Sequence, residues 1–142
     1  MAAGDPTSTP HKLIADLMAV NAQSAFNRWC GIEVIAAEPG SIAIAMPWRD
    51  DVGQYSGFLH AGVVAALIDT ACGYAAATLV GRVLAASFHV NCIRPAVGSR
   101  FQADAKVIRA GKRQIFTTCE LFADSERGRT LVATGETLLL RA

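Results

Sequence analysis

An acidic residue interrupts the apolar stretch at the centre of the chain. Residues 57–81 read GFLHAGVVAALIDTACGYAAATLVG, and Asp69 is the only acidic residue among them, with no Lys or Arg to pair with it. Buried carboxylates are rare unless they are paired. An Asp has a reference pKa of about 3.9, so a moderate upward shift leaves it ionised at neutral pH. Asp69 is therefore a candidate general base or nucleophile, and the alternative is a structural acceptor of hydrogen bonds.

Polar groups precede this carboxylate at the point where a helix begins. Gly57 and Gly62 bracket the junction between loop and helix, and the backbone N–H groups of Ala61 and Gly62 would point out of the helix start. Such a terminus can hold an anion or a developing oxyanion. Gln54 and His60 add side-chain polarity, although His60 can instead cap the helix by bonding to backbone. Together with Asp69 these groups would form an acyl-transfer site.

The helix that must position Asp69 is predicted over about residues 60–79 and closed by Gly81. A helical wheel puts only small residues on the same face as Asp69, namely Gly62, Ala65, Ala66, Gly73 and Ala76. The opposite face has the larger residues Val64, Leu67, Ile68, Tyr74 and Thr78. The larger face is expected to pack on a sheet, and the small face is expected to border a groove with Asp69 as its only polar group. Gly73 costs a helix about 1 kcal/mol relative to Ala, which suggests a close approach at that point.

The rest of the chain predicts one α+β domain over residues 9–142, with residues 1–8 expected to be disordered. Thr9-Pro10 is typical of a helix start, and helical spacing continues over about 10–27. Pro39-Gly40 predicts a β-hairpin within residues 31–48. Period-two patterns then predict four strands within 82–96, 99–111, 112–124 and 129–141. Short joints at Gly98-Ser99, Gly111-Lys112 and Glu126–Gly128 predict that successive strands pair antiparallel. An antiparallel sheet of about six strands is thus expected to pack on the long helix.

Composition argues against several functional classes. The 142 residues carry a formal net charge of +1 without a long basic run, so a nucleic-acid partner is not expected. Residues 57–81 are long enough to span a bilayer, but Asp69 at their centre would cost about 2.5–3.5 kcal/mol, so no membrane partner is expected either. The first residues lack the pattern of a secretion signal, which favours a cytoplasmic protein. The hydrophobic content of 52% fits a multimer.

The four cysteines are scattered through the sequence. Cys30, Cys72, Cys92 and Cys119 form no CxxC pair and no cluster flanked by His. Neither a metal site nor a disulfide framework is expected from such spacing. The prediction is free thiols, mostly buried, as in a reducing compartment.

The loop and helix around Asp69 resemble those of the hot-dog-fold acyl-CoA thioesterases of the phenylacetate-degradation (PaaI-like) type, in the 4-hydroxybenzoyl-CoA thioesterase superfamily. That family carries an Asn or Gln, then Gly, then His-Gly-Gly, then Leu-x-Asp. Those spacings are held here by Gln54, Gly57, His60, Gly62, Leu67 and Asp69. The second half is also similar, at Arg94-Pro95-Ala96, at the Gly98 turn and at RAGKR. The resemblance covers about residues 28–140.

The resemblance implies a long helix wrapped by a curved antiparallel sheet, and a homodimer that joins two sheets edge to edge, usually paired into a homotetramer. It implies active sites at the dimer interface that use residues of both subunits. By position, Asp69 would be the general base or nucleophile, the N–H of Ala61 would polarise the thioester carbonyl, and Gln54 would orient the water or the carbonyl. The substrate would be an acyl-CoA, with no separate cofactor.

Three positions depart from the family pattern. Ala61 replaces the first Gly of His-Gly-Gly, so its methyl group narrows the approach to the carbonyl. Gln54 is one methylene longer than the usual Asn. A strand Ser or Thr of some relatives falls on Ala85, and Ser87, expected on the same strand face, could replace it. These departures leave the class unchanged and leave the acyl preference open.

The basic residues near the strand joints, Arg94, Arg109, Lys112 and Arg113, have two interpretations. They could contact the phosphates of CoA, or they could be solvated hairpin charges, which is the commoner case. Two other functions also remain. A hydratase or dehydratase of the same fold would use His60 or His89 with a carboxylate, and a non-catalytic module would bind acyl-CoA without turnover.

Overall fold

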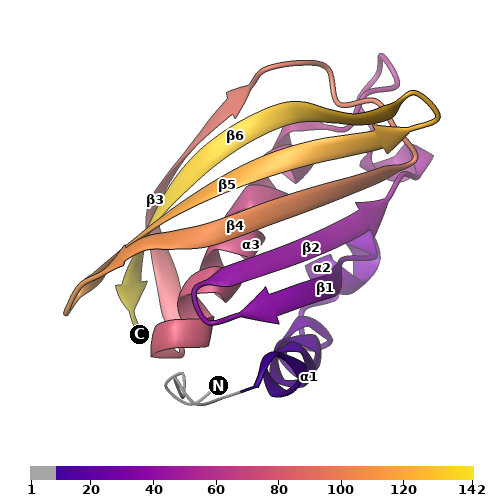
Figure 1. Cartoon of the computed structure of the whole chain (residues 1–142). Coiled ribbons are helices and arrows are strands. Elements are labelled where there is room, and N and C mark those ends of the chain that lie inside the picture. Colours follow the sequence, from indigo (N-terminus) through magenta and orange to yellow (C-terminus); the bar gives the residue numbers. More distant parts are fainter. Residues whose placement is uncertain (1–8) are drawn as a thin grey trace.

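The computed structural model describes residues 9–142, so the disorder expected for residues 1–8 lies outside the described part. One antiparallel sheet curves around a long central helix, α3 (Ala61–Val80), as Figure 1 shows. Its strands lie in the order β1-β2-β4-β5-β6-β3. Their bounds are β1 (Glu33–Glu38), β2 (Ser41–Pro47), β3 (Val83–Cys92), β4 (Arg100–Ala110), β5 (Gln114–Ser125) and β6 (Gly128–Arg141). The expected α+β architecture is confirmed.

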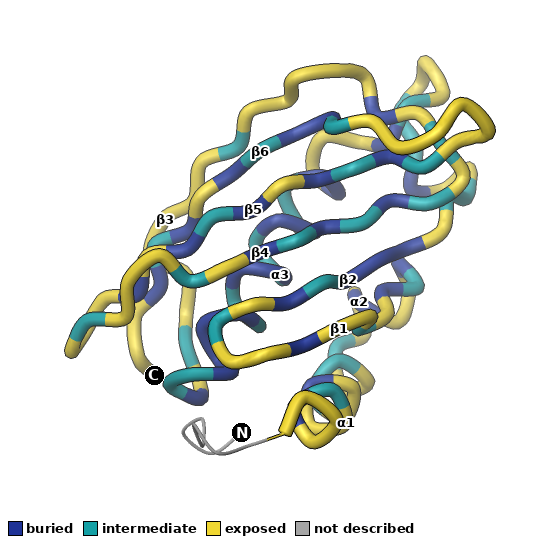
Figure 2. Tube along the Cα trace, viewed as in Figure 1, coloured by how far each residue is buried: buried dark blue, intermediate teal, exposed yellow. Residues whose placement is uncertain are grey.

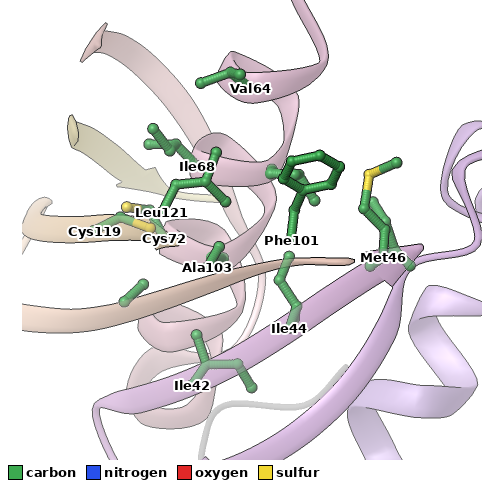
Figure 3. Packing of buried hydrophobic residues seen from close by; sticks show 14 of the residues in the cluster. Ile42, Ile44, Met46, Val64, Ile68, Cys72, Phe101, Ala103, Cys119 and Leu121 are labelled. Carbon is green, nitrogen blue, oxygen red and sulfur yellow. The ribbon is translucent and has the colours of Figure 1, made fainter. Parts of the chain in front are cut away.

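The core lies between the inner face of the sheet and α3. Alternate residues of β4 and β5 are buried, as period-two patterning requires, and Figure 2 shows this alternation along both strands. The side chains that fill the interior include Ile44, Phe101 and Leu121 from the sheet and Ile68 from α3 (Figure 3). Because α3 contacts every strand, the position of Asp69 is fixed by the whole sheet.

The bounds of α3 agree with the prediction to within one residue at each end. His60 caps its start, and Gly81 ends it with φ 78, a left-handed conformation that favours glycine. By length and hydropathy alone α3 could cross a membrane, with a mean hydropathy of 1.7. It is instead the helix that the sheet wraps, and more than half of its most apolar stretch is buried inside the protein.

Gly135 of β6 allows α3 to approach the sheet closely. A Cβ built at this position would lie 2.6 Å from Cγ2 of Ile68 and 2.9 Å from the carbonyl oxygen of His89. Such distances are below normal contact, so any side chain here would push α3 away from β6. Ile68 directly precedes Asp69. By allowing this close packing, Gly135 helps to determine how near the Asp69 carboxylate lies to the sheet.

The prediction of one helix over residues 10–27 is wrong, because two helices occupy the N-terminal region. Helix α1 (Pro10–Asn21) is capped by Thr9, and α2 (Ala25–Cys30) begins after Ser24. The Ser24 side chain accepts a hydrogen bond from the N–H of Asn27 at 3.2 Å, so it starts a new helix where the periodic pattern had suggested continuation.

The predicted pairing of successive strands fails at one joint. β3 does not pair with β4 through Gly98-Ser99; it pairs with β6 and lies at the edge of the sheet. Residues 93–99 form a crossing segment rather than a tight turn. Ala96 in this segment is buried, and its carbonyl accepts the N–H of Leu59 at 3.0 Å. The joint is therefore tied to the loop before α3, and this long-range contact leaves no pattern in local sequence.

All four cysteines are free thiols, and all except Cys92 are buried, as predicted. Cys72 of α3 and Cys119 of β5, distant in sequence, lie side by side in the core (Figure 3). A hydrogen bond with Cys72 and burial both raise the pKa of Cys119, so this thiol is neutral at physiological pH.

Candidate active site

Asp69 lies in a cleft of about 820 Å³ between α3, the start of β3 and the two N-terminal helices. The residues of α3 that line it are Asp69, Thr70, Gly73, Tyr74 and Ala77. The wheel prediction is thus corrected, because four residues of the predicted small face do not line the cleft, namely Gly62, Ala65, Ala66 and Ala76. Ala76 is fully buried, and Tyr74 borders the cleft. Because every strand of the sheet contacts α3, the open face of the helix is narrower than the wheel suggested.

The Asp69 carboxylate has no protein partner among residues 9–142. No hydrogen bond or ion pair reaches it, although the residue is half-buried. Burial raises the pKa of its carboxyl group, because the ionised form loses contact with water. It is the only carboxylate on the cleft wall within the described chain, and Thr70 adds a hydroxyl that the sequence had not indicated. An unpartnered carboxylate facing open space is equipped to accept a proton or to attack an electrophile.

This environment predicts that Asp69 destabilises the native state when ionised. The pKa of Asp69 is higher in the folded than in the unfolded chain. The free energy of unfolding is therefore highest at acid pH, where the carboxyl group is neutral in both states, and it falls as the pH rises from the unfolded to the folded pKa. Asp69→Asn should therefore raise the free energy of unfolding at pH 7. The difference from wild type should vanish below the unfolded pKa of about 3.9.

Urea unfolding at several pH values measures this difference, with Asp50→Asn, a change at an exposed carboxylate, as the control. An Asp69→Asn protein less stable than wild type at pH 7 would mean that the carboxylate has a stabilising partner.

At its N-terminus, α3 presents one free amide rather than the two expected. Nδ1 of His60 accepts the N–H of Gly62 at 2.8 Å, so the capping interpretation of His60 is confirmed. A Cβ at Gly62 would lie 2.9 Å from that nitrogen, which explains the glycine. Within residues 9–142 the N–H of Ala61 donates to no acceptor, and it is the remaining candidate for an oxyanion donor.

Gln54 and Gly57 shape the loop before α3 and do not line the cleft. Oε1 of Gln54 accepts the N–H of Ser56 and, at 3.5 Å, that of Phe58. Gly57 is exposed, and its φ of 81 is a conformation that other residues avoid. Both residues thus help to position Leu59 and His60, directly before the free amide of Ala61.

Ala85 and Ser87 of β3, which were expected on the same face of the strand, lie on opposite faces. Ala85 lines the cleft and pairs with Leu139. The expectation that Ser87 shares its face is wrong, because a bulge between the two residues turns Ser87 toward Leu138 on the outer face. Ser87 borders a different hollow, near Phe116.

The predicted phosphate contacts are also apart from the cleft. Nη1 of Arg94 donates to the carbonyl of Leu131 at 2.6 Å, while Lys112 and Arg113 are exposed at the β4–β5 turn. Neither the guanidinium of Arg94 nor the β4–β5 turn lines the Asp69 cleft of this chain.

The N-terminal helices α1 and α2 form one wall of the Asp69 cleft, which was not predicted from the sequence. Leu17 and Val20 of α1, Gln23 and Ser24 of the junction and Asn27 of α2 all line the cleft. A signal was present, because Leu17 and Val20 belong to the apolar stripe of α1. The sequence did not indicate that this stripe faces α3 rather than the sheet alone.

Comparisons with known proteins agree with this geometry. Residues 56–130, just over half of the chain, match the family model described as "Thioesterase superfamily". A solved thioesterase family protein from Silicibacter pomeroyi is 31% identical, with a TM-score of 0.85, over 92% of this chain and 96% of its own. The PaaI protein of the Escherichia coli phenylacetic acid degradation operon shares the fold at 22% identity, with a TM-score of 0.84, over 95% of this chain and 96% of its own. A thioesterase from Haemophilus influenzae is similar at 24% identity and a TM-score of 0.80, over 99% and 94%.

Proposed function

Because the chain belongs to the thioesterase superfamily, we propose that it hydrolyses an acyl-CoA thioester with a small, medium-chain or aromatic acyl group to the free acid and CoA. The observation that supports this proposal best is Asp69, an unpartnered carboxylate of raised pKa in a cleft with both apolar and polar walls. The match to the family extends through this residue. No separate cofactor is needed for the reaction.

The chemistry follows from the two groups that α3 presents. In one route the Asp69 carboxylate takes a proton from water as the oxygen attacks the thioester carbonyl. In the other route Asp69 attacks the carbonyl itself, and water then hydrolyses the mixed anhydride. Both routes pass through a tetrahedral oxyanion, which the N–H of Ala61 would stabilise, and both expel the thiolate of CoA.

These two groups cannot act on the same carbonyl within one chain. Ala61 and Asp69 are eight residues apart on α3, which corresponds to about 12 Å along the axis. An oxyanion donor must lie about 3 Å from the oxygen it stabilises, and a base must reach its proton directly or through one water. We therefore propose that a second copy completes the site, so that the carbonyl meets Asp69 of one subunit and the Ala61 amide of the other.

Strand β3 is the proposed surface of that pairing. It lies at the edge of the sheet and is exposed along almost its whole length, as Figure 2 shows. Its exposed residues include Leu84 and Phe88, at 68% and 52%. A long, apolar strand edge with unpaired backbone groups invites a neighbouring strand. Pairing here would bring two copies together beside the Asp69 cleft, which the start of β3 also lines.

The alternative functions have less support. A hydratase would need a histidine beside the carboxylate, and within one chain neither His60 nor His89 lines the Asp69 cleft. His60 uses Nδ1 to cap α3, and His89 lies 3.2 Å from Asn91 on the outer face of β3. A non-catalytic module would bind the same ligand without turnover.

A panel of acyl-CoA substrates separates these functions. Release of free thiol from hexanoyl-, benzoyl- or phenylacetyl-CoA is the expected result. Hydration of crotonyl-CoA without thiol release would identify a hydratase. Saturable binding of hexanoyl-CoA with no turnover over several hours would identify a binding module, and either outcome would contradict the proposal.

Two substitutions at Gly73 are expected to have different effects, one on the stability of α3 and the other on binding of the acyl group in the cleft. A Cβ at Gly73 meets no atom within 4 Å, so Gly73→Ala should stabilise the protein by about 0.5–1 kcal/mol through helix propensity. Gly73→Leu should fill the cleft and lower kcat/KM for hexanoyl-CoA about tenfold or more. Urea unfolding and thiol release measure the two effects. Full activity in Gly73→Leu would show that the acyl group lies elsewhere.

A further inference from the structure

A closed network of hydrogen bonds joins the three helices around the cleft. The hydroxyl of Tyr74 on α3 donates to Oδ1 of Asn21 at 2.8 Å and accepts from Nδ2 of Asn27 at 3.0 Å. Nδ2 of Asn27 also donates to Oδ1 of Asn21 at 2.9 Å. Asn21 in turn donates to the carbonyl of Ile32 at 2.8 Å. One phenol thus ties the end of α1 and the whole of α2 to the central helix.

This network holds the Tyr74 ring in one position. Asn27 is only 7% exposed, so these bonds are largely shielded from water. Burial raises the pKa of the Tyr74 phenol, which therefore remains a neutral donor. A hydrogen bond of this kind contributes about 0.5–1.5 kcal/mol, and a buried group left without its partner costs about 1–3 kcal/mol. Rotation of the ring away from the cleft would break several such bonds together.

The ring of Tyr74 borders the same cleft as Asp69, on the side of α3 that faces α1 and α2. Asp69, Gly73 and Ala77 follow one another at four-residue spacing on the open face of α3 and all line the cleft. Tyr74 is five residues after Asp69, or about 7.5 Å further along the helix axis. A Cβ built at Gly73 would meet no atom within 4 Å apart from its chain neighbours. A group that extends from Asp69 past Gly73 toward α1 and α2, to which the ring is hydrogen-bonded, therefore reaches Tyr74.

Apolar residues form two sides of this part of the cleft, beside the polar side chains of Gln23, Ser24, Asn27 and Arg82. Leu17 and Val20 of α1 face it from one side, and Ala85 and Leu139 of the sheet face it from the other. These apolar sides suit a hydrocarbon or aromatic group, and Arg82 is a single cation among the lining residues of the described chain rather than a cluster for phosphates. The part of the substrate that belongs here is the acyl group rather than the nucleotide of CoA.

We propose that Tyr74 is a specificity-determining residue whose ring, held by Asn21 and Asn27, limits the length of the acyl group that the cleft accepts. This inference rests on the proposed thioesterase function. It assigns the acyl-binding side to the wall formed by α1, α2 and Tyr74. The enzyme accordingly prefers short or compact acyl groups to long ones.

The test compares kcat/KM for dodecanoyl-CoA and hexanoyl-CoA in the same preparation of each variant. Tyr74→Ala, or Tyr74→Leu if the first folds poorly, should raise the ratio of dodecanoyl to hexanoyl activity about tenfold or more. Tyr74→Phe keeps the ring but removes the hydrogen bonds, and it should raise the ratio by a smaller factor. Tyr55→Ala is the matched control, because Tyr55, the only other tyrosine, is fully exposed and should leave the ratio unchanged.

A ratio of two substrates does not change when part of the sample is unfolded, so a merely structural role for Tyr74 would not alter it. An unchanged ratio in Tyr74→Ala and Tyr74→Leu would overturn the inference while leaving the thioesterase proposal in place. An unchanged ratio in Tyr74→Phe alone would show that the hydrogen bonds do not hold the wall. If wild type hydrolyses neither substrate nor any other acyl-CoA, the proposed function fails and this inference fails with it.

Discussion

Asp69→Asn is expected to lower kcat/KM for acyl-CoA hydrolysis by about 10²–10⁴-fold, the contribution typical of a positioned general base. The amide has nearly the shape of the carboxylate but can neither accept the proton of water nor attack the carbonyl. Because Asp69 has no hydrogen-bonding partner within residues 9–142, its replacement breaks no contact of the described fold. Release of free thiol from hexanoyl-CoA measures the loss.

The stability expected of the same variant makes this result interpretable. Burial disfavours the ionised carboxyl group, so the Asn protein should be at least as stable as wild type at pH 7. A loss of activity could then not be assigned to unfolding. Asp50→Asn should keep wild-type turnover. If Asp69→Asn hydrolysed hexanoyl-CoA at the wild-type rate, the site would have to be sought in another part of the molecule.

Ala61→Pro is expected to lower kcat by about 10²–10³-fold, as the loss of one oxyanion donor does. Proline is well suited to the first position of a helix, and its ring removes only the N–H that has no acceptor in the described chain. His60 has φ −59 and ψ 134, a conformation that the residue before proline adopts readily. The fold should therefore survive.

Ala61→Gly is the control, because it retains the N–H and removes only the methyl group. This variant should keep activity within a few-fold of wild type, and circular dichroism should show the same helix content for both variants. Equal losses in Ala61→Gly and Ala61→Pro would assign the effect to the side chain rather than to the amide.

Mixing the two inactive variants tests whether the site is shared between subunits. In a mixed dimer, one site would combine the intact Asp69 of one chain with the intact amide of the other. Random pairing of equal amounts makes half of the dimers mixed, each with one working site. We expect roughly a quarter of wild-type activity after co-expression. If the mixture were no more active than either variant alone, both groups would have to act within one subunit. The proposal of a shared site would then be wrong.

The sequence alone predicted the features whose signals are local. The bounds of α3, the Pro39-Gly40 hairpin and the β4–β5 and β5–β6 turns follow from periodicity and from glycine or proline at fixed places. The capping interpretation of His60, one of two left open by the sequence, is confirmed, while the family spacing singled out Asp69 and Ala61 as candidates.

The errors arose where distant segments meet. The β3–β6 pairing depends on a crossing segment that is tied to Leu59. The bulge after Ala85 reversed the face of Ser87. The place of Tyr74 on the cleft wall, which the sequence did not indicate, involves hydrogen bonds with Asn21 and Asn27, 53 and 47 residues earlier in the chain.

The Asp69 carboxylate and the opposite wall of its cleft belong to different structural elements, and this has an evolutionary consequence. Asp69 belongs to a helix that every strand contacts, so exchanges among its buried neighbours threaten the entire fold. The opposite wall depends on two short helices at the margin of the sheet and a few side-chain bonds. If the proposed function holds, exchanges within residues 10–30 are expected to change the acyl preference by few mutations while leaving the groups on α3 in place.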